Sequence, residues 1–162
     1  MAVKSIRVVP DPVLREKASP IKQIDRSTVK LIDDMVETLR SAGGVGLAAP
    51  QVGILLRVIV IEIPKAGLFI MINPEIIKRS GQRTVTEGCL SIPGYEADIK
   101  RSGSVIARAF DIRGKEFSLK AKDLLSHALE HEIDHLDGVL YIDYLESVDK
   151  LRSLETQEPA EK

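Results

Sequence analysis

Cysteine and aromatic residues are scarce in this chain. Of its 162 residues, one is cysteine, none is tryptophan, and phenylalanine and tyrosine contribute three each. A lone cysteine, Cys89, cannot form an internal disulfide. This pattern favours a reducing compartment, and we expect a cytoplasmic protein.

Long apolar runs and an excess of charge are missing as well. Apolar runs such as 58–61 are far too short to cross a membrane, and no secretion signal is expected in residues 1–16. The net charge of −1 indicates neither a nucleic-acid nor a membrane partner. With 44% apolar and 29% charged residues, the chain is typical of a single globular domain over 1–162, in which only 156–162 resembles a frayed polar tail.

Hydrophobic periodicity predicts helices towards both ends and strands between them. An amphipathic helix is predicted over 27–41, with Asp25 or Ser27 as its N-cap and Gly43-Gly44 at its end. Strands are predicted over 54–63 and 68–73, the second ending at Pro74, with 76–79 and 82–86 continuing the sheet. A hairpin is expected between 104–110 and 116–120. Because βαβ alternation is absent, we expect an α+β fold with mainly antiparallel sheets around a C-terminal helix over 122–136.

The glycine-rich segment 43–51 has two open interpretations. It is too rich in glycine and alanine for a strand, and Pro50 opposes a helix. No Lys-Ser/Thr pair follows the glycines, so a phosphate loop is disfavoured. The segment is either a flexible link or a loop whose backbone approaches a ligand closely.

The most informative stretch is His131-Glu132-Ile133-Asp134-His135 in the C-terminal helix. Two histidines four residues apart share one helix face, about 6 Å apart along the axis, and can hold one divalent metal. Glu132 is then free to act on a metal-bound water. On a helical wheel Glu132 lies inside a broad apolar arc, whereas Ser126 and Glu130 lie on the opposite, polar arc. A buried carboxylate is costly unless it is paired or used, which favours a catalytic site over two satisfied core imidazoles.

A catalytic metal needs a third protein ligand. The candidates are His127, Cys89, Glu87 and Asp143. Positions 127, 131 and 135 span about 12 Å of helix axis, so three imidazoles on one straight helix cannot converge on one ion. We therefore expect His127 to be a pocket wall or a half-exposed neighbour. Cys89 is favoured, because it lies in a polar, glycine-containing break, although an isolated cysteine is more often a small buried apolar residue.

Three motifs occur in order along the chain: GVGLAAPQ at 44–51, EGCLS at 87–91 and HEIDHLDG at 131–138. Together they are highly specific, and over essentially its whole length the chain resembles the peptide deformylases. The residue before the third motif is usually glutamine in that family and is Glu130 here. Because position 130 lies on the polar arc, we expect this departure to matter little.

The resemblance implies a role for each motif. Cys89, His131 and His135 would hold the metal with water as the fourth ligand, and Glu132 would act as general base and then as acid. Gln51 and the backbone N–H of Leu90 would steady the oxygen of the formyl group. The family uses Fe2+ and also accepts Zn2+, Ni2+ or Co2+. The reaction implied is removal of the formyl group from N-formylmethionine on peptides and nascent chains, as part of protein biosynthesis.

The same resemblance suggests how substrate lies in the site. An extended peptide would add as a strand along Gly44, Val45 and Gly46. The methionine side chain would enter a hole lined by Val45, Leu124, His127 and Ala128. Glu87 would either contact substrate or orient a ligand or the loop. Asp134 would pair with Arg101 or serve only at the surface.

Two rival functions use the same residues. A zinc peptidase would apply H-E-x-x-H chemistry to internal peptide bonds, although peptidases usually take His or a carboxylate as third ligand. A non-enzymatic metal-binding protein would close the shell with four ligands. The sequence leaves open the metal, the oligomeric state, docking near the ribosome and the role of 147–162. A short helix could place Val148, Leu151 and Leu154 on one side.

Overall fold

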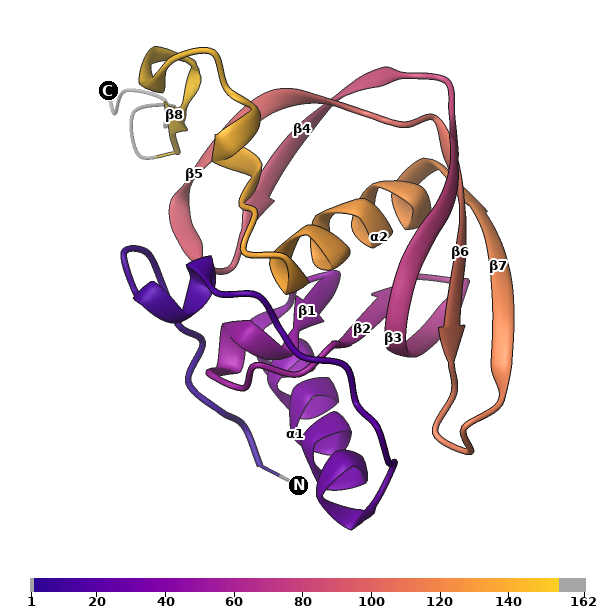
Figure 1. Cartoon of the computed structure of the whole chain (residues 1–162). Coiled ribbons are helices and arrows are strands. Elements are labelled where there is room, and N and C mark those ends of the chain that lie inside the picture. The colour runs from indigo at the N-terminus through magenta and orange to yellow at the C-terminus, as the bar shows by residue number, and fades with distance from the viewer. Residues whose placement is uncertain (1, 155–162) are drawn as a thin grey trace.

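The computed structural model, which describes residues 2–154, has two antiparallel sheets and two α-helices (Figure 1). The five-stranded sheet has the order β1-β2-β3-β6-β7, and the three-stranded sheet has the order β4-β5-β8. Helix α2 (Asp123–Leu136) runs between the two sheets, and helix α1 (Arg26–Ala42) lies below the larger one (Figure 1). The expected α+β class with antiparallel sheets is confirmed. The strands are β1 (Gly46–Ala48), β2 (Val58–Ile63), β3 (Gly67–Ser80), β4 (Arg83–Cys89), β5 (Ile92–Arg101), β6 (Ser104–Phe110), β7 (Glu116–Lys122) and β8 (Arg152–Ser153).

Helix α1 begins and ends at residues suited to those positions. The Asp25 side chain accepts a hydrogen bond from the Thr28 backbone N–H at 3.1 Å, which satisfies one of the free donors of the first turn. Gly43 closes the helix with a left-handed φ of 72°. Ser27, the alternative cap, lies inside the first turn. Among residues 2–154, no helix is both long and apolar enough to span a membrane.

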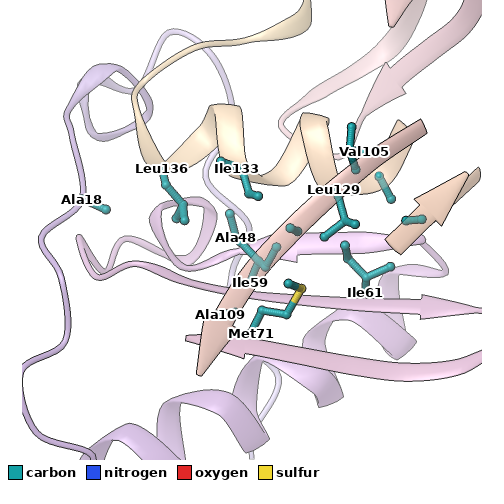
Figure 2. Packing of buried hydrophobic residues seen from close by; sticks show 13 residues of the cluster. Ala18, Ala48, Ile59, Ile61, Met71, Val105, Ala109, Leu129, Ile133 and Leu136 are labelled. Carbon is teal, nitrogen blue, oxygen red and sulfur yellow. The ribbon is translucent and has the colours of Figure 1, made fainter. Parts of the chain in front are cut away.

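Strand β2 is buried on both faces, which explains its unbroken apolar sequence. Ile59 and Ile61 point towards α2 and join the cluster drawn in Figure 2. Val58 and Val60 point the other way, into the cluster shared with α1. All four side chains are fully buried, and burial of each contributes about 1.5–3 kcal/mol. This double-sided packing fixes the large sheet between the two helices.

The predicted end of a strand at Pro74 is wrong, because β3 continues through it as far as Ser80. The pairing with β6 shifts register between Ile72 and Glu75, so the proline sits at an irregularity rather than in a regular ladder. Asn73 adopts a φ of 51°, and its side chain hydrogen-bonds the N–H and C=O of Ile21 at 2.8 and 2.9 Å. The Asn73 side chain therefore bonds both backbone groups of Ile21, as a neighbouring strand would, and holds β3 at this irregularity.

Two further predictions about local structure are wrong. Residues Gly46–Ala48 form strand β1 against β2, because backbone pairing needs no particular side chain. Residues 147–154 form a 3₁₀ turn (Val148–Lys150) and strand β8 instead of one helix. The predicted hairpin is confirmed as β6 and β7. The predicted tail, 156–162, lies outside the described residues.

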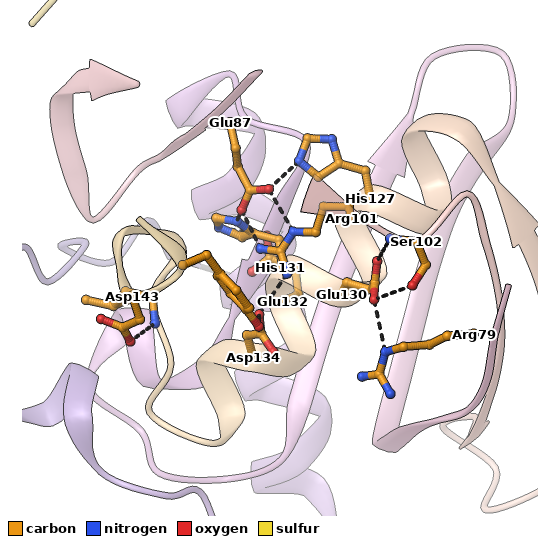
Figure 3. Close-up of polar contacts among 12 residues, drawn as sticks. Arg79, Glu87, Arg101, Ser102, His127, Glu130, His131, Glu132, Asp134 and Asp143 are labelled. Carbon is orange, nitrogen blue, oxygen red and sulfur yellow. Dashed lines mark hydrogen bonds and ion pairs between the residues drawn. The ribbon is translucent and has the colours of Figure 1, made fainter. Parts of the chain in front are cut away.

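Two residues that the helical wheel assigns to the polar arc of α2 are buried in the structure. Ser126 is fully buried and Glu130 is 6% exposed. The Glu130 carboxylate accepts hydrogen bonds from the backbone N–H and hydroxyl of Ser102 and from Arg79 (Figure 3). The chain that leaves β5 covers this side of the helix at Ser102, so the Glu130 carboxylate is buried and paired within the protein.

Candidate active site

Three side chains of the kinds that bind metal ions meet where the end of β4 approaches α2. The ligand atoms of Cys89, His131 and His135 all lie within 4.8 Å of one another. Cys89 Sγ is 3.3 Å from His135 Nε2, although 46 residues separate the two in sequence. His127 is not part of this group, and Asp143 is instead held by Arg15 at 2.6 and 2.9 Å.

The surroundings of these three residues fit a divalent cation. His131 Nδ1 is hydrogen-bonded to Glu87, which leaves Nε2 facing the cluster, an arrangement common among metal-binding histidines. Burial lowers the pKa of His135 well below its usual value and keeps the imidazole neutral, as a ligand must be. Burial alone would also lower the pKa of His131, but Glu132, Cys89 and Glu87 raise it well above its usual value. The same negative groups that favour a proton at this position would favour a metal cation.

A buried charge network orients His131 (Figure 3). Glu87, 2% exposed, accepts two hydrogen bonds from Arg101, at 2.9 and 2.6 Å, and also contacts His127 Nε2 at 2.6 Å. Burial would raise the pKa of Glu87, yet the hydrogen bonds from His127, His131 and Arg101 hold it well below its usual range. Arg101 in turn contacts Asp134 at 2.8 Å. Glu87 is therefore an anion under all ordinary conditions, and its geometry is that of a positioning group.

Glu132 is placed differently from the paired carboxylates around it. It is 4% exposed, and its Oε1 atom has no hydrogen-bond partner among the described residues. Its other oxygen, Oε2, lies 3.9 Å from His131 Nε2. Burial raises the pKa of Glu132 to about 7. A carboxylate with that pKa can accept and return a proton near neutral pH.

The glycine-rich segment passes directly over Glu132. A Cβ atom at Gly46 would lie 2.6 Å from Glu132 Oε2, and one at Gly44 would lie 2.8 Å from a methyl carbon of Leu90. The backbone at Gly46 therefore approaches the Glu132 side chain closely. Close approach to a ligand, the second interpretation of this segment, stays a prediction. A larger residue at position 46 would occupy the space of that carboxylate.

Gln51 is held rigidly beside Cys89. It is 1% exposed, and its Oε1 accepts from the Ala48 backbone N–H at 3.0 Å. Its Nε2 donates to Ser91 Oγ at 3.0 Å and lies 3.8 Å from Cys89 Sγ. Ser91 N also lies 3.4 Å from that sulfur. With the amide oxygen and one N–H of Gln51 fixed, its other N–H is directed at Cys89 Sγ.

These groups open into a cavity of about 360 Å³. Twelve of the thirteen predicted site residues line it, and the exception, His135, is a buried member of the ligand cluster. Six lining residues were not predicted: Thr86, Gly88, Ile92, Gly94, Tyr95 and Leu154. Four of these lie next to the EGCLS motif in sequence, and that proximity could have indicated them. No feature of the sequence indicated that Leu154 lies at the site.

Comparisons with known proteins agree with one another. A family model described as polypeptide deformylase matches residues 3–151. A peptide deformylase of Dehalococcoides mccartyi is 52% identical over 155 residues, which cover 95% of this chain and 93% of the relative. A crystal structure of a peptide deformylase from Legionella pneumophila superposes with a TM-score of 0.89 at 41% identity, covering 92% of this chain and 89% of that one. The peptide deformylase from Ehrlichia chaffeensis in complex with actinonin gives 0.90 at 38% identity, covering 93% and 92%.

Proposed function

Because the chain belongs to the peptide deformylase family, enzymes that remove formyl groups from N-terminal methionine, we propose that Glu132 is its catalytic base and acid. The observation that carries this proposal is the Glu132 carboxylate, buried beside a Cys/His/His cluster, with one oxygen unpartnered among residues 2–154 and a pKa of about 7. Every neighbouring buried carboxylate is paired, so only this one is free for proton transfer.

We propose that Cys89, His131 and His135 hold the metal, with Fe2+ as the native ion and Zn2+, Ni2+ or Co2+ able to replace it. A thiolate with two imidazoles is a donor set that suits these ions. When bound, such a cation supplies Lewis acidity, lowering the pKa of a water ligand and polarising a carbonyl oxygen. Metal analysis of protein purified without oxygen tests the identity of the ion.

In the proposed hydrolysis, the residues of the chain move one proton and stabilise one developing charge. Glu132 accepts a proton from the water whose oxygen bonds to the formyl carbon. Gln51 Nε2 and the Leu90 backbone N–H donate to the formyl oxygen as negative charge builds on it, and one such donor is worth about 3–4 kcal/mol of barrier. The C–N bond then breaks, Glu132 gives its proton to the departing amine, and formate leaves.

We propose that substrate lies along the edge strand β1, with Gly44, Val45 and Gly46 as its backbone contacts. Leu124, His127 and Ala128 then form the methionine hole, since all three line the cavity. Recognition through backbone and a single side chain suits nascent chains of many sequences, and we place the reaction in the cytoplasm. Glu87 serves to orient His131 and His127 in this arrangement.

Formate release from formyl-Met-Ala-Ser tests the proposed function. We expect turnover of this peptide and loss of turnover in Glu132→Ala with the metal still bound. Asp33→Ala, on the exposed face of α1, is the matched control and should behave as the unmodified protein. Release of amino acids without formate would indicate a peptidase, and full turnover in Glu132→Ala would indicate a structural metal site.

A further inference from the structure

The C-terminal end of the described chain lies at the cavity, although the proposed reaction does not use it. Leu154 lines the cavity together with Tyr95 and Leu124. These three side chains are 41%, 43% and 43% exposed. Single exposed apolar residues need no explanation. Three of them around one opening form an apolar rim, here defined as Tyr95, Leu124 and Leu154.

Backbone hydrogen bonds and ion pairs hold Leu154 at the apolar rim. Strand β8 pairs with β5 through Tyr95↔Ser153 and Glu96↔Arg152, and the Leu154 N–H donates to the Gly94 carbonyl at 2.9 Å. Arg152 fastens the strand through Glu96 at 3.1 Å and Asp98 at 2.9 Å. Just before the strand, the Leu151 side chain packs against the core cluster under the small sheet. Strand β8, which lies beside β5 in Figure 1, is therefore anchored to β5 by backbone pairing and by Arg152.

Strand spacing shows which part of a substrate Leu154 can reach. Gly94 is two residues beyond Ile92, and Ile92 pairs with Cys89. Two residues along a strand and two strand spacings across the sheet separate Leu154 from Cys89 by roughly 12 Å. An extended peptide covers that distance in about three to four residues. Leu154 thus lies within reach of the residues that follow methionine in an extended substrate whose formyl group lies at Cys89.

We propose that Leu154 is a specificity-determining residue, through which strand β8 makes the enzyme prefer substrates with apolar side chains after the formylmethionine. The inference rests on the proposed function and extends it from the formyl group to the second, third and fourth residues of the substrate. The chemistry is removal of water from two facing apolar surfaces, one on the rim and one on the peptide. Polar substrates lack the matching surface and gain nothing from the rim.

The test compares two peptides, formyl-Met-Leu-Leu-Leu and formyl-Met-Ser-Ser-Ser. In Leu154→Ala we expect the ratio of their kcat/KM values to fall roughly three- to tenfold, mainly through KM, because a shortened apolar contact weakens binding of the leucine peptide alone. Leu154→Lys should shift preference towards formyl-Met-Asp-Asp-Asp. Val148→Ala is the matched control, since Val148 is 82% exposed in the same segment and does not line the cavity.

Binding of the product peptides Met-Leu-Leu-Leu and Met-Ser-Ser-Ser, followed by calorimetry, makes the same comparison without turnover. The ratio of their dissociation constants should fall in Leu154→Ala as the kinetic ratio does. Unchanged ratios, or an equal fall in kcat for both formyl peptides, would overturn the proposal, because the segment would then only support the fold. An absence of formate from every peptide would refute the proposed function, while the binding ratio would still decide the role of Leu154.

Discussion

A methyl group at position 46 tests how closely the glycine-rich segment fits the Glu132 side chain. In Gly46→Ala the new Cβ would lie 2.6 Å from Oε2, 2.8 Å from Cγ and 2.9 Å from Cδ of Glu132. Gly46 is not among the glycines with positive φ, so the backbone itself accepts alanine. Any cost therefore comes from contact with the carboxylate.

The size of the effect follows from the overlap. Carbon contacts are most favourable at about 3.5–4.0 Å, so Glu132 or the segment must move by roughly 1 Å. A displacement of that size at a reacting group lowers turnover by about 10²-fold. Overpacking costs about 1–3 kcal/mol of folding free energy, against which alanine recovers about 0.4–1 kcal/mol by restricting the unfolded chain.

The assay is a double-mutant cycle with Glu132→Ala, read by formate release and by urea unfolding of the metal-loaded protein. In the Glu132→Ala background, the methyl group at position 46 meets no carboxylate, so Gly46→Ala should be neutral or stabilising. The two substitutions should therefore couple by about 1–3 kcal/mol. Wild-type turnover in Gly46→Ala, with the same change in unfolding free energy in both backgrounds, would refute this reasoning.

Three further predictions concern charge and hydrogen bonding. Burial raises the pKa of Glu132 from 4.5 to about 7, so between these values the folded protein keeps a proton that the unfolded chain releases, and stability falls as pH rises. Glu132→Gln should flatten that slope in urea unfolding of chelator-treated protein. In the unmodified enzyme formate release should fall towards acidic pH as the Glu132 carboxylate is protonated. Arg101→Ala leaves the buried Glu87 carboxylate without its cation and should lower the free energy of unfolding in urea by about 3–5 kcal/mol. Arg108→Ala, which breaks an exposed pair with Glu75, should change the unfolding midpoint little. Gln51→Leu should lower kcat by about 10²–10³ in the formate assay through loss of one donor; an unchanged kcat would remove Gln51 from the proposed reaction.

The parts of the site that follow from local geometry could be predicted from the sequence. The four-residue spacing of His131 and His135 fixes their common face on any helix. The span of about 12 Å from 127 to 135 prevents all three histidines from meeting at one ion, and His127 lies outside the ligand cluster. The partnership of Cys89 with His135 is different, because it joins segments 46 residues apart. Residue chemistry favoured Cys89 among four candidates, and the resemblance to a known family supported that choice.

The errors share one cause, which is that they depend on neighbours distant in the chain. Strand β1 is made by backbone pairing with β2, and its composition carries no signal of that. Glu130 lies on the polar arc of a helical wheel, but its burial depends on Ser102 and Arg79 from other elements. Leu154 reaches the cavity only because β8 pairs with β5.

The short length of β1 also limits aggregation with other polypeptide chains. β1 is the terminal strand of the five-stranded sheet, and an open sheet edge is a template for pairing with any extended polypeptide. Three residues offer only about 10 Å of ladder, and Pro50, two residues after the strand, prevents its extension. Such an edge is long enough to hold the end of one peptide and too short to seed a continuous sheet between molecules. An enzyme that meets unfolded chains as substrate can thus keep an edge open without aggregating through it.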